Sequence, residues 1–454
     1  MTTRMAWLAG MVSASALLAA CGTTAIDQSA SLAPSVEQTV AAQTGADQDS
    51  VVRQAVPTGQ AVAERRVAVN APKSAAQAEA EASNRVIVSA ARNAKRTGNL
   101  EPYIKALSDA SCPAGTAVRA ADAISIRAMP TALQPSDPAK RKIGSLTYVA
   151  GYQLSSTDTR FGGLSGIEVL DNGDLLAVSD AGYFVWMDLA DDGLTPTTAR
   201  LSTMRDITGQ ALTGVAGDSA EGLAINGGMA LVSFEGNHRV LAFDIGKCGA
   251  AARGAPIVFG NYGLPLREAY ADARISVDAG NGSEPLAVTK DWFLFTGIEK
   301  KLGHLNSLSA RPIESEPEFD LLVGVDAPEF AGIDILPDQQ GNGAVRTFLI
   351  HRSRDAKDGR VWVTETDLQR HEDRTRDYGP VRGEMDARSR QRYTETGWRE
   401  LAQLNQFGVV DQFEGIAAKQ LSDGRVRLYL ISDDDYSADK RTVLMVFDLA
   451  KPMR

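Results

Sequence analysis

A seven-residue phrase recurs along this chain, and its recurrence constrains the fold more than any other feature of the sequence. It reads DSAEGLA at 218–224, NGSEPLA at 281–287 and DQFEGIA at 411–417. Two degenerate copies are GGLSGIE at 162–168 and PEFAGID at 328–334. Each copy opens an apolar stretch that is typical of a β-strand. A phrase repeated every 50–80 residues or so indicates a repeat architecture, in which one unit cannot bury its own apolar face.

From about residue 143 onward, short strand-like segments alternate with turn signals. The segments are rich in β-branched and aromatic residues, as in DLLAVSD at 174–180 and RVRLYLISDD at 425–434. Turns such as DNGD at 171–174 and SDGR at 422–425 are typical of hairpins. About 310 residues at roughly 50 per four-stranded unit predict an all-β fold, a six-bladed β-propeller. A large β-sandwich or barrel is the alternative.

One stretch does not show this alternation of strand-like segments and turns. Residues 367–405 are highly charged, and the pattern predicts an inserted loop or a helix pair there.

The first residues are typical of an export signal. Arg4 precedes an apolar run at 5–20, which is too short to span a bilayer and ends in LAAC, with Cys21 as the last residue. This ending resembles a bacterial lipoprotein signal, in which the cysteine is acylated and becomes the mature N-terminus. The chain is then expected to be exported and lipid-anchored in the cell envelope, on the periplasmic face of the outer membrane. A plain secretory signal with an incidental cysteine is the alternative.

We expect three regions along the chain: a signal at 1–20, an Ala-rich tether at 21–110 and the β-domain at 111–454. Residues 22–74 lack aromatics and steady periodicity, as tethers do. Residues 75–97 favour a helix by propensity, with their acids early and their bases late. The pattern does not decide whether this helix packs on the domain.

The other two cysteines, Cys112 and Cys248, predict a disulfide in an oxidising compartment. Metal binding is the alternative, although two distant cysteines lack the spacing of metal ligands.

The charge of the chain limits which kinds of partner it can bind. Residues 111–454 carry 37 basic and 48 acidic side chains, so nucleic acid is not expected as a partner, and a polyanionic substrate would need a bridging cation.

Four segments together carry a family resemblance: 161–182, 218–240, 281–288 and 411–449. They resemble the phytase-like family described as having esterase-like activity, over roughly residues 140–454. The resemblance implies a propeller fold and hydrolysis of an ester or a phosphoester. It implies no agreed set of catalytic residues.

The repeated phrase places carboxylates near the propeller axis. Because the innermost strand of a blade lines the channel, Glu221, Glu284 and Glu414 are expected at one channel mouth. The end of the next strand returns to the same rim, which adds Glu235 and Asp433. Carboxylate oxygens without histidine or cysteine suit Ca²⁺ or Mg²⁺, so these five residues predict a divalent-cation site, with calcium favoured. Alternatively, the glutamates bond backbone amides or basic side chains and hold the blades in register.

Basic residues follow the same hairpin ends, and they are the predicted catalytic groups: His238, Arg239, His351, Arg352 and Arg441. Arginine binds phosphate and carboxylate oxyanions bidentately. Water activated by the cation would attack the ester, while a carboxylate or His238 accepts its proton. The alternative is that these arginines only neutralise neighbouring acids. Ser165 is not expected to be a nucleophile, because its surroundings lack the strand–turn–helix of a nucleophile elbow.

The sequence therefore predicts a hydrolase that acts on a small-molecule ester, with a phosphoester favoured. Its membrane contact would be through the lipid anchor only. A function from another class stays open, namely a non-catalytic envelope scaffold whose propeller face binds a protein or a glycan.

Overall fold

The computed structural model describes residues 73–214, 219–258, 282–302, 305–323, 327–337, 343–353, 360–373, 387–404 and 411–450. The chain divides into two compact units, residues 1–71 and 72–454. All described residues belong to the second unit. The predicted signal and Cys21 lie outside the described residues.

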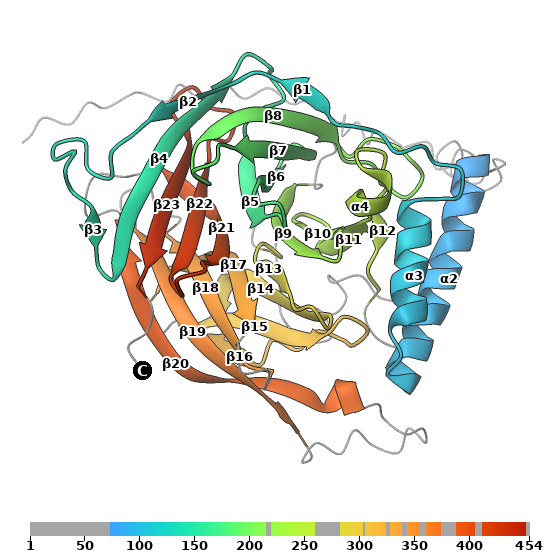
Figure 1. The fold of residues 1–454 in the computed structure, drawn as a ribbon. Coiled ribbons are helices and arrows are strands. Elements are labelled where there is room, and N and C mark those ends of the chain that lie inside the picture. The colour runs from blue at the N-terminus through green and yellow to red at the C-terminus, as the bar shows by residue number, and fades with distance from the viewer. Residues whose placement is uncertain are drawn as a thin grey trace, which may run out of the picture. The chain divides into compact units, whose positions relative to one another are not determined.

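The described strands form five antiparallel sheets, which are the blades of a β-propeller (Figure 1). Blade 1 contains β5 (Leu164–Val169), β6 (Leu175–Ser179), β7 (Tyr183–Leu189), β8 (Pro196–Thr203) and β1 (Asp122–Ile124). Blade 2 contains β9 (Ala220–Asn226), β10 (Met229–Phe234), β11 (Arg239–Phe243) and β12 (Ala255–Pro256). Blade 3 contains β13 (Leu286–Val288), β14 (Phe293–Leu302), β15 (Leu305–Pro312) and β16 (Leu321–Val323).

Blade 4 is continuous in sequence, whereas blade 5 combines strands from both ends of the domain. Blade 4 contains β17 (Glu329–Pro337), β18 (Val345–Arg352), β19 (Val361–Glu372) and β20 (Gln391–Gln403). Blade 5 contains β21 (Gln412–Gln420), β22 (Val426–Asp433), β23 (Thr442–Leu449), β4 (Leu146–Ser156), β2 (Ile126–Pro130) and β3 (Lys142–Ile143). Because β4 pairs with β23, the N-terminal part of the domain completes the last blade and closes the ring.

The repeated phrase forms the innermost strand of each blade, and its glycine explains how the ring closes. A Cβ atom at Gly222 would lie 2.1 Å from the carbonyl oxygen of Glu284, and one at Gly332 would lie 2.0 Å from that of Glu414. The last copy meets the first in the same way, since a Cβ atom at Gly415 would lie 2.9 Å from the carbonyl oxygen of Ser165. Glycine is therefore required at this place in four of the five copies, and the blade 3 copy has Pro285 there.

The prediction of six blades is wrong for the described residues, which form five. An average blade length does not predict the number of blades here, because the blades differ in length. Blade 4 is longer than average because β19 and β20 form an extended hairpin, and blade 5 takes strands from both ends of the domain. The five copies of the phrase correspond one to one with the five blades.

The charged stretch at 367–405 is also not what the pattern predicted. Its described residues are mainly strand, with β19 and β20 paired from Trp362↔Gln403 to Glu372↔Gln391, and only a short 3₁₀ turn, η1 (Ala387–Arg390). Four consecutive residues of β20, from Thr394 to Gly397, are exposed. Charged side chains are therefore compatible with a strand here, because the outer strand of a blade faces water.

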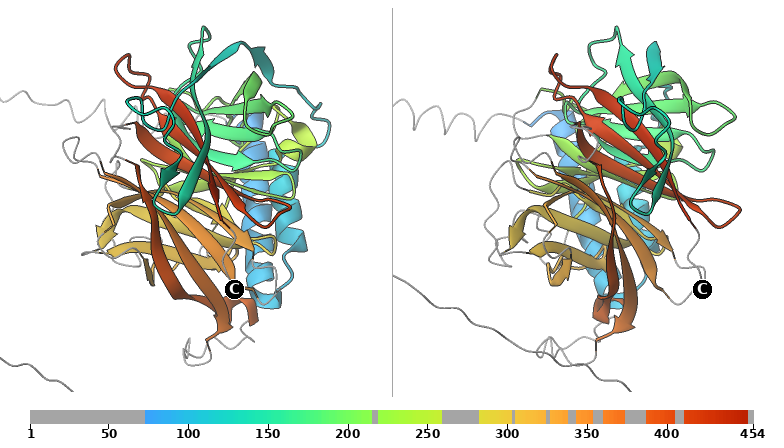
Figure 2. Two further views of the ribbon diagram at one scale, coloured as in Figure 1. Left: turned by 60° about the vertical axis from the view of Figure 1, so that its left-hand side comes forward. Right: turned by 90° about the vertical axis from the view of Figure 1, so that its left-hand side faces the viewer.

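Two helices precede the propeller and lie side by side in all views (Figures 1 and 2). Helix α2 (Ala75–Thr97) begins at a capping box formed by Ser74 and Gln77, which confirms the predicted helix. Its buried residues Ile87 and Ala91 pack in one apolar cluster with α3 (Glu101–Ser111) and with residues of blades 2 and 3. The structure thus decides what the sequence left open: α2 is packed on the propeller.

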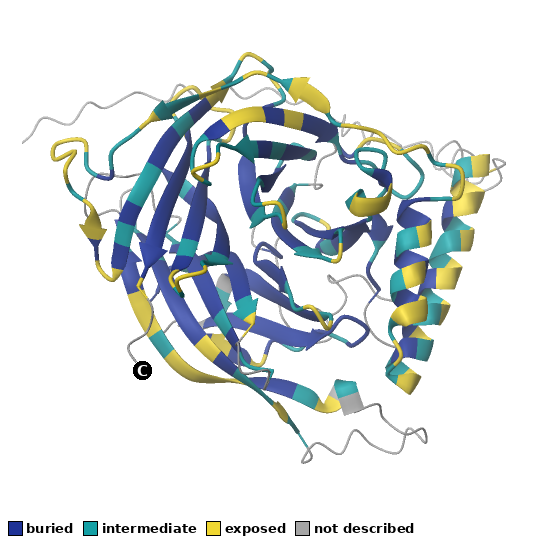
Figure 3. Ribbon diagram, viewed as in Figure 1, coloured by how far each residue is buried: buried dark blue, intermediate teal, exposed yellow. Residues whose placement is uncertain are grey.

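The expected pairing of Cys112 with Cys248 is present as a disulfide, with Cα atoms 5.8 Å apart. It connects the residue after α3 to the short helix α4 (Ile245–Cys248) of blade 2. The blades themselves are buried along most of their inner strands (Figure 3). Among the described helices, none is both long and apolar enough to cross a membrane.

Candidate functional site

Strand register defines which residues of the five blades are equivalent at the channel mouth. In blade 2, Ala220 pairs with Phe234, and in blade 5 Phe413 pairs with Ser432. Glu221 follows Ala220 and Glu414 follows Phe413, and both are the glutamates of the repeated phrase. Glu235 follows Phe234 and Asp433 follows Ser432, at the end of the second strand of each hairpin. Each blade therefore presents one phrase position and one hairpin position at the same rim.

The same register holds around the ring. The phrase positions are Ser165, Glu221, Glu284, Ala331 and Glu414. The hairpin positions are Asp180, Glu235, Glu299, Arg352 and Asp433. We call these ten residues the mouth ring. It places seven carboxylates around one guanidinium, that of Arg352, and the structure thus brings the three predicted phrase glutamates together.

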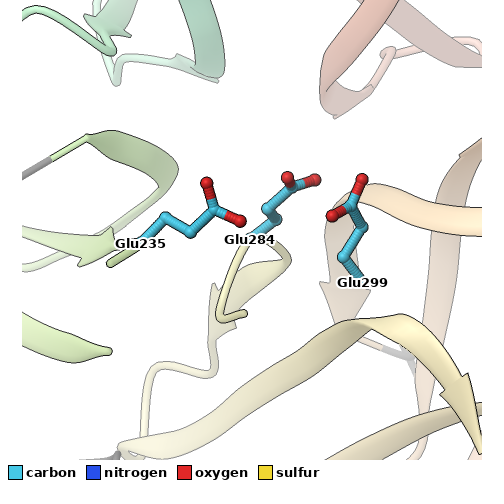
Figure 4. Close-up of side chains that lie close together, drawn as sticks. All are labelled: Glu235, Glu284 and Glu299. Carbon is cyan, nitrogen blue, oxygen red and sulfur yellow. The ribbon is translucent and has the colours of Figure 1, made fainter. Parts of the chain in front are cut away.

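Three of the carboxylates are close enough to hold one ion. Oxygen atoms of Glu235, Glu284 and Glu299 all lie within 4.8 Å of one another. Their carboxylates converge from blades 2 and 3 (Figure 4). Two of them, Glu235 and Glu284, are among the predicted ligands. Glu299 was not, although it follows Glu284 by 15 residues, close to the 14 that separate Glu221 from Glu235 in the neighbouring blade.

Glu284 is the buried carboxylate at the centre of this cluster. It is 5% exposed, and its buried Oε2 atom has no hydrogen-bond partner among the residues that the structure describes. Burial first, and then the neighbouring Glu299, raise the pKa of Glu284 well above its ordinary range. An ionised carboxylate in such a place needs a compensating charge, since a buried charge without one is strongly unfavourable.

Arg352 supplies part of that compensation. Its Nη2 lies 2.8 Å from Oε1 of Glu414 and 3.6 Å from Oε1 of Glu299. Burial alone would lower the pKa of this guanidinium, but Glu414 and Glu284 outweigh burial and raise it. Arg352 therefore stays charged between the three-glutamate cluster and the Glu414 side of the ring.

Two carboxylic acids on the Glu414 side, Glu221 and Asp433, retain protons near neutral pH. Burial and then the Glu414 carboxylate raise the pKa of Glu221 to about 8 and that of Asp433 to about 9. Burial also raises the pKa of Asp180. Glu221 and Asp433 can hold or release a proton in the range where most enzymes work.

His238 belongs to the same site. It is 2% exposed, and a Cβ atom at Gly282 would lie 1.9 Å from its Cε1 atom. The backbone N–H of Gly282 donates to Oε1 of Glu235 at 3.2 Å. Gly282, two residues before Glu284 in the phrase, therefore has no room for a side chain, because the imidazole and the Glu235 carboxylate both lie against it.

The other predicted catalytic residues have different surroundings. Arg441 makes a two-bond ion pair with Asp411, at 3.0 and 2.7 Å. Arg239 lies over the ring of Phe234, with its Cζ 4.5 Å from the ring centroid.

His351 lies inside the blades and away from the rim. Its Nε2 is 3.0 Å from Oγ1 of Thr364, its Nδ1 is 3.2 Å from the carbonyl of Pro328, and its ring stacks on Phe330. Burial lowers its pKa to about 3. These contacts are those of a neutral core histidine.

Acidic residues also occupy the opposite end of the innermost strands, but they have backbone partners. Asp334 accepts from the N–H groups of Ile335 and Ala418, both at 2.6 Å, and so joins blade 4 to blade 5. Burial raises its pKa to about 7. Asp334 and Glu168 occur in the two copies whose phrase position lacks an acid. The channel between the two ends is narrow, with a cavity of about 10 Å³ lined by Glu221 and Glu414 among others.

Comparison with known proteins points to one family. The model of the phytase-like family, described as "Esterase-like activity of phytase", matches residues 159–436, which is more than half of the chain. This segment contains the whole mouth ring. No curated protein matched the chain.

Solved structures give distant similarities only. The aldose sugar dehydrogenase of Streptomyces coelicolor, in its PQQ-bound form, is 13% identical over 68% of this chain and 99% of its own, with a TM-score of 0.35. The PQQ domain of pyranose dehydrogenase from Coprinopsis cinerea is 11% identical over 74% and 99%, with a TM-score of 0.33. The soluble aldose sugar dehydrogenase of Escherichia coli, in its apo form, is 9% identical over 64% and 97%, with a TM-score of 0.33. Similarity at this level carries no argument about ligand or activity.

Proposed function

This chain belongs to the phytase-like family, and we propose that it hydrolyses an ester, with a phosphoester favoured, using a divalent cation held at the propeller mouth. The observation that carries the proposal is the convergence of the Glu235, Glu284 and Glu299 carboxylates within 4.8 Å. The description of the family supports ester hydrolysis as the type of reaction.

The donor set fits a hard cation. Carboxylate oxygens are the ligands that Ca²⁺ and Mg²⁺ prefer, and calcium accepts six to eight oxygens in a flexible arrangement. The unpartnered Oε2 of Glu284 is an atom that such an ion would satisfy. Compared with the predicted ligands, the proposed set keeps Glu235 and Glu284 and adds Glu299. Glu221, Glu414 and Asp433 become neighbours that adjust its charge.

The protein's own groups have separate roles in this proposal. When bound, the cation polarises the ester and offsets its negative charge. Arg352 faces the same site and is suited to orient an oxyanion, because a guanidinium binds phosphate oxygens in pairs. His238 stands beside Gly282 and can accept a proton from an attacking water. Glu221 and Asp433 hold protons near neutral pH and can pass one to the departing alcohol.

The test is turnover of generic phosphomonoester, phosphodiester and carboxylic ester substrates, with calcium added or removed by a chelator. We expect turnover that depends on the cation and falls at least about 100-fold in Glu284→Gln, by analogy with the loss of one charge-stabilising group. Glu79→Gln, on the exposed side of α2, is the matched control and should be unchanged.

Binding of the ion is measured separately from turnover. Calcium should raise the melting temperature of the wild-type protein and of Glu79→Gln, and it should not do so in Glu284→Gln. Metal analysis that finds no bound ion, together with a melting temperature that calcium leaves unchanged, would overturn the cation. Turnover that persists in Glu284→Gln would show that the reaction takes place at another site of the protein.

Export and anchoring complete the proposal and rest on the sequence alone. The LAAC ending supports acylation of Cys21 and a location on the periplasmic face of the outer membrane. Metabolic labelling with a radioactive fatty acid should mark the wild-type chain and leave Cys21→Ser unmarked. A wild-type chain without label would leave only the plain secretory signal.

A further inference from the structure

Tyr436 is an exposed aromatic residue beside the mouth ring. It lies in the connection between β22 and β23, three residues after Asp433 of the mouth ring. Its side chain is 41% exposed, and it is one of four large hydrophobic residues exposed in the described part of the chain. A large aromatic surface left open to water at a channel mouth is a candidate contact for a ligand.

The ring of Tyr436 is held in one place. Its hydroxyl lies 2.8 Å from Oγ of Ser179 and donates to the carbonyl of Arg160 at 3.1 Å. The ring packs on the turn before β5, where a Cβ atom at Gly163 would lie 2.6 Å from Cε2 of Tyr436. The residue is therefore anchored to blade 1 although it belongs to blade 5, and its ring is preorganised.

The backbone adopts an unfavourable conformation to present this ring. Asp435 and Tyr436 have φ angles of 44° and 50°, a region that residues with a Cβ atom seldom adopt. Two consecutive residues of this kind persist only where the surrounding contacts determine them, and such strain is concentrated at functional sites.

The charges around the ring are negative. A Cβ atom at Gly163 would lie 2.0 Å from Oδ1 of Asp180, so the Asp180 carboxylate and the Tyr436 ring flank the same glycine. Asp434 accepts from the N–H of Gly163 at 2.8 Å and from the hydroxyl of Thr442 at 2.8 Å. The two nearby cations each have an acidic partner: Arg160 pairs with Asp158 and Asp122, and Lys440 pairs with Asp435, the residue before Tyr436.

We infer that Tyr436, Asp180 and Asp434 form a subsite for an organic cation, so that the preferred ester carries a quaternary or primary ammonium group. A cation gains from the electron-rich face of the ring and from the two carboxylates together. A neutral group of the same shape gains only the contact area, and an anion is repelled. The assignment of this cation to the substrate rests on the proposed function.

The test uses choline and its neutral isostere 3,3-dimethyl-1-butanol as probes, titrated into the purified full-length chain by calorimetry or by saturation-transfer NMR. We expect choline to bind at least about two- to fivefold more tightly than the isostere, as a cation–π contact at an exposed site predicts. Tyr436→Ala should remove this preference. Tyr436→Phe keeps the ring and should retain most of it. Higher salt should weaken choline binding and leave the isostere unchanged.

Equal binding of the two probes, or a preference that survives in Tyr436→Ala with an unchanged melting temperature, would overturn the subsite. The result is independent of turnover. Choline binding without any hydrolysis that depends on the divalent cation would support the subsite and contradict the proposed function. Hydrolysis that depends on the divalent cation, without a preference for choline, would support the proposed function and contradict the subsite.

Discussion

Arg352 and Glu414 form an ion pair across the boundary between blades 4 and 5, with Nη2 of the arginine 2.8 Å from Oε1 of the glutamate. Register makes Arg352 the blade 4 equivalent of Asp433, Glu235 and Asp180. A position that is acidic in the other four blades is therefore basic in the blade whose phrase position is Ala331. This exchange offsets part of the negative charge of the mouth ring.

Replacing Arg352 by methionine should destabilise the cation-free protein by about 3–5 kcal/mol, because it leaves buried carboxylates without their partner. Urea denaturation measures the change. Arg200→Met is the matched control, since Arg200 pairs with Asp188 at a site where its side chain is 44% exposed. Its loss should cost at most about 1 kcal/mol. Equal losses in the two variants would contradict the role given to Arg352.

Stability of the cation-free protein should fall as pH rises, and Glu221→Gln should weaken that dependence. The pKa of Glu221 is raised from its ordinary value of 4.5 to about 8, chiefly by burial and then by Glu414. Between these values the folded protein holds a proton that the unfolded chain has released. The contribution of Glu221 to stability is therefore greatest below pH 4.5 and is lost as pH rises through 8. Asp433 acts in the same direction.

Melting temperatures of chelator-treated protein across this pH range check the prediction. The wild type should lose several degrees, Glu221→Gln fewer, and added calcium should reduce the loss in the wild type. A wild-type melting temperature that stays level or rises with pH would show that Glu221 is ionised in the folded protein without a cation.

Gly332→Ala should destabilise the propeller by about 1–3 kcal/mol or more, because the added Cβ would lie 2.0 Å from the carbonyl oxygen of Glu414. Both groups belong to backbone in the innermost strands and have little freedom to move apart. Gly397→Ala in β20 is the control, since no atom of the described part of the chain lies within 4 Å of its Cβ position. It should change stability by less than about 0.5 kcal/mol. Similar behaviour of the two variants in denaturant would refute the close packing of adjacent blades.

Removing the Cys112–Cys248 disulfide should lower the free energy of unfolding by about 2–5 kcal/mol. The bond closes a loop with a sequence separation of 136, so its loss frees a long segment of the unfolded chain. The double variant Cys112→Ser/Cys248→Ser is compared with the wild type by thermal unfolding, with and without reductant. Reductant should affect only the wild type. Mass spectrometry that finds both thiols free in protein from an oxidising environment would end this prediction.

The repeated phrase made the ring architecture predictable, but the number of blades was misjudged. Average blade length is a poor guide when a blade carries an extension such as the β19–β20 hairpin. The count of phrase copies is a better one, because each copy corresponds to one innermost strand. The glycine of the phrase had a meaning that only the structure showed, namely the contact of Gly222 with the Glu284 backbone.

The site was predictable in kind and only partly in detail. Spacing after the phrase located Glu235 and Asp433 at the rim, since antiparallel strands return to the same end. It could not select Glu299 over Glu221 as the third member of the cluster, because that choice depends on side-chain direction across a blade boundary. His351 and Arg352 are neighbours in sequence and have opposite surroundings, one in the core and one at the mouth, because successive residues of a strand point to opposite faces.

The amino-acid sequence by itself determined that this chain repeats one strand-forming unit, that its acids recur at equivalent places and that Cys112 and Cys248 suit each other as partners. Those properties are local or periodic, so they can be read along the chain. Only the tertiary structure decided that there are five blades, that Arg352 stands among the carboxylates and that Tyr436 reaches from the last blade to the first. These depend on which distant segments meet when the ring closes, and closure is a property of packing in three dimensions.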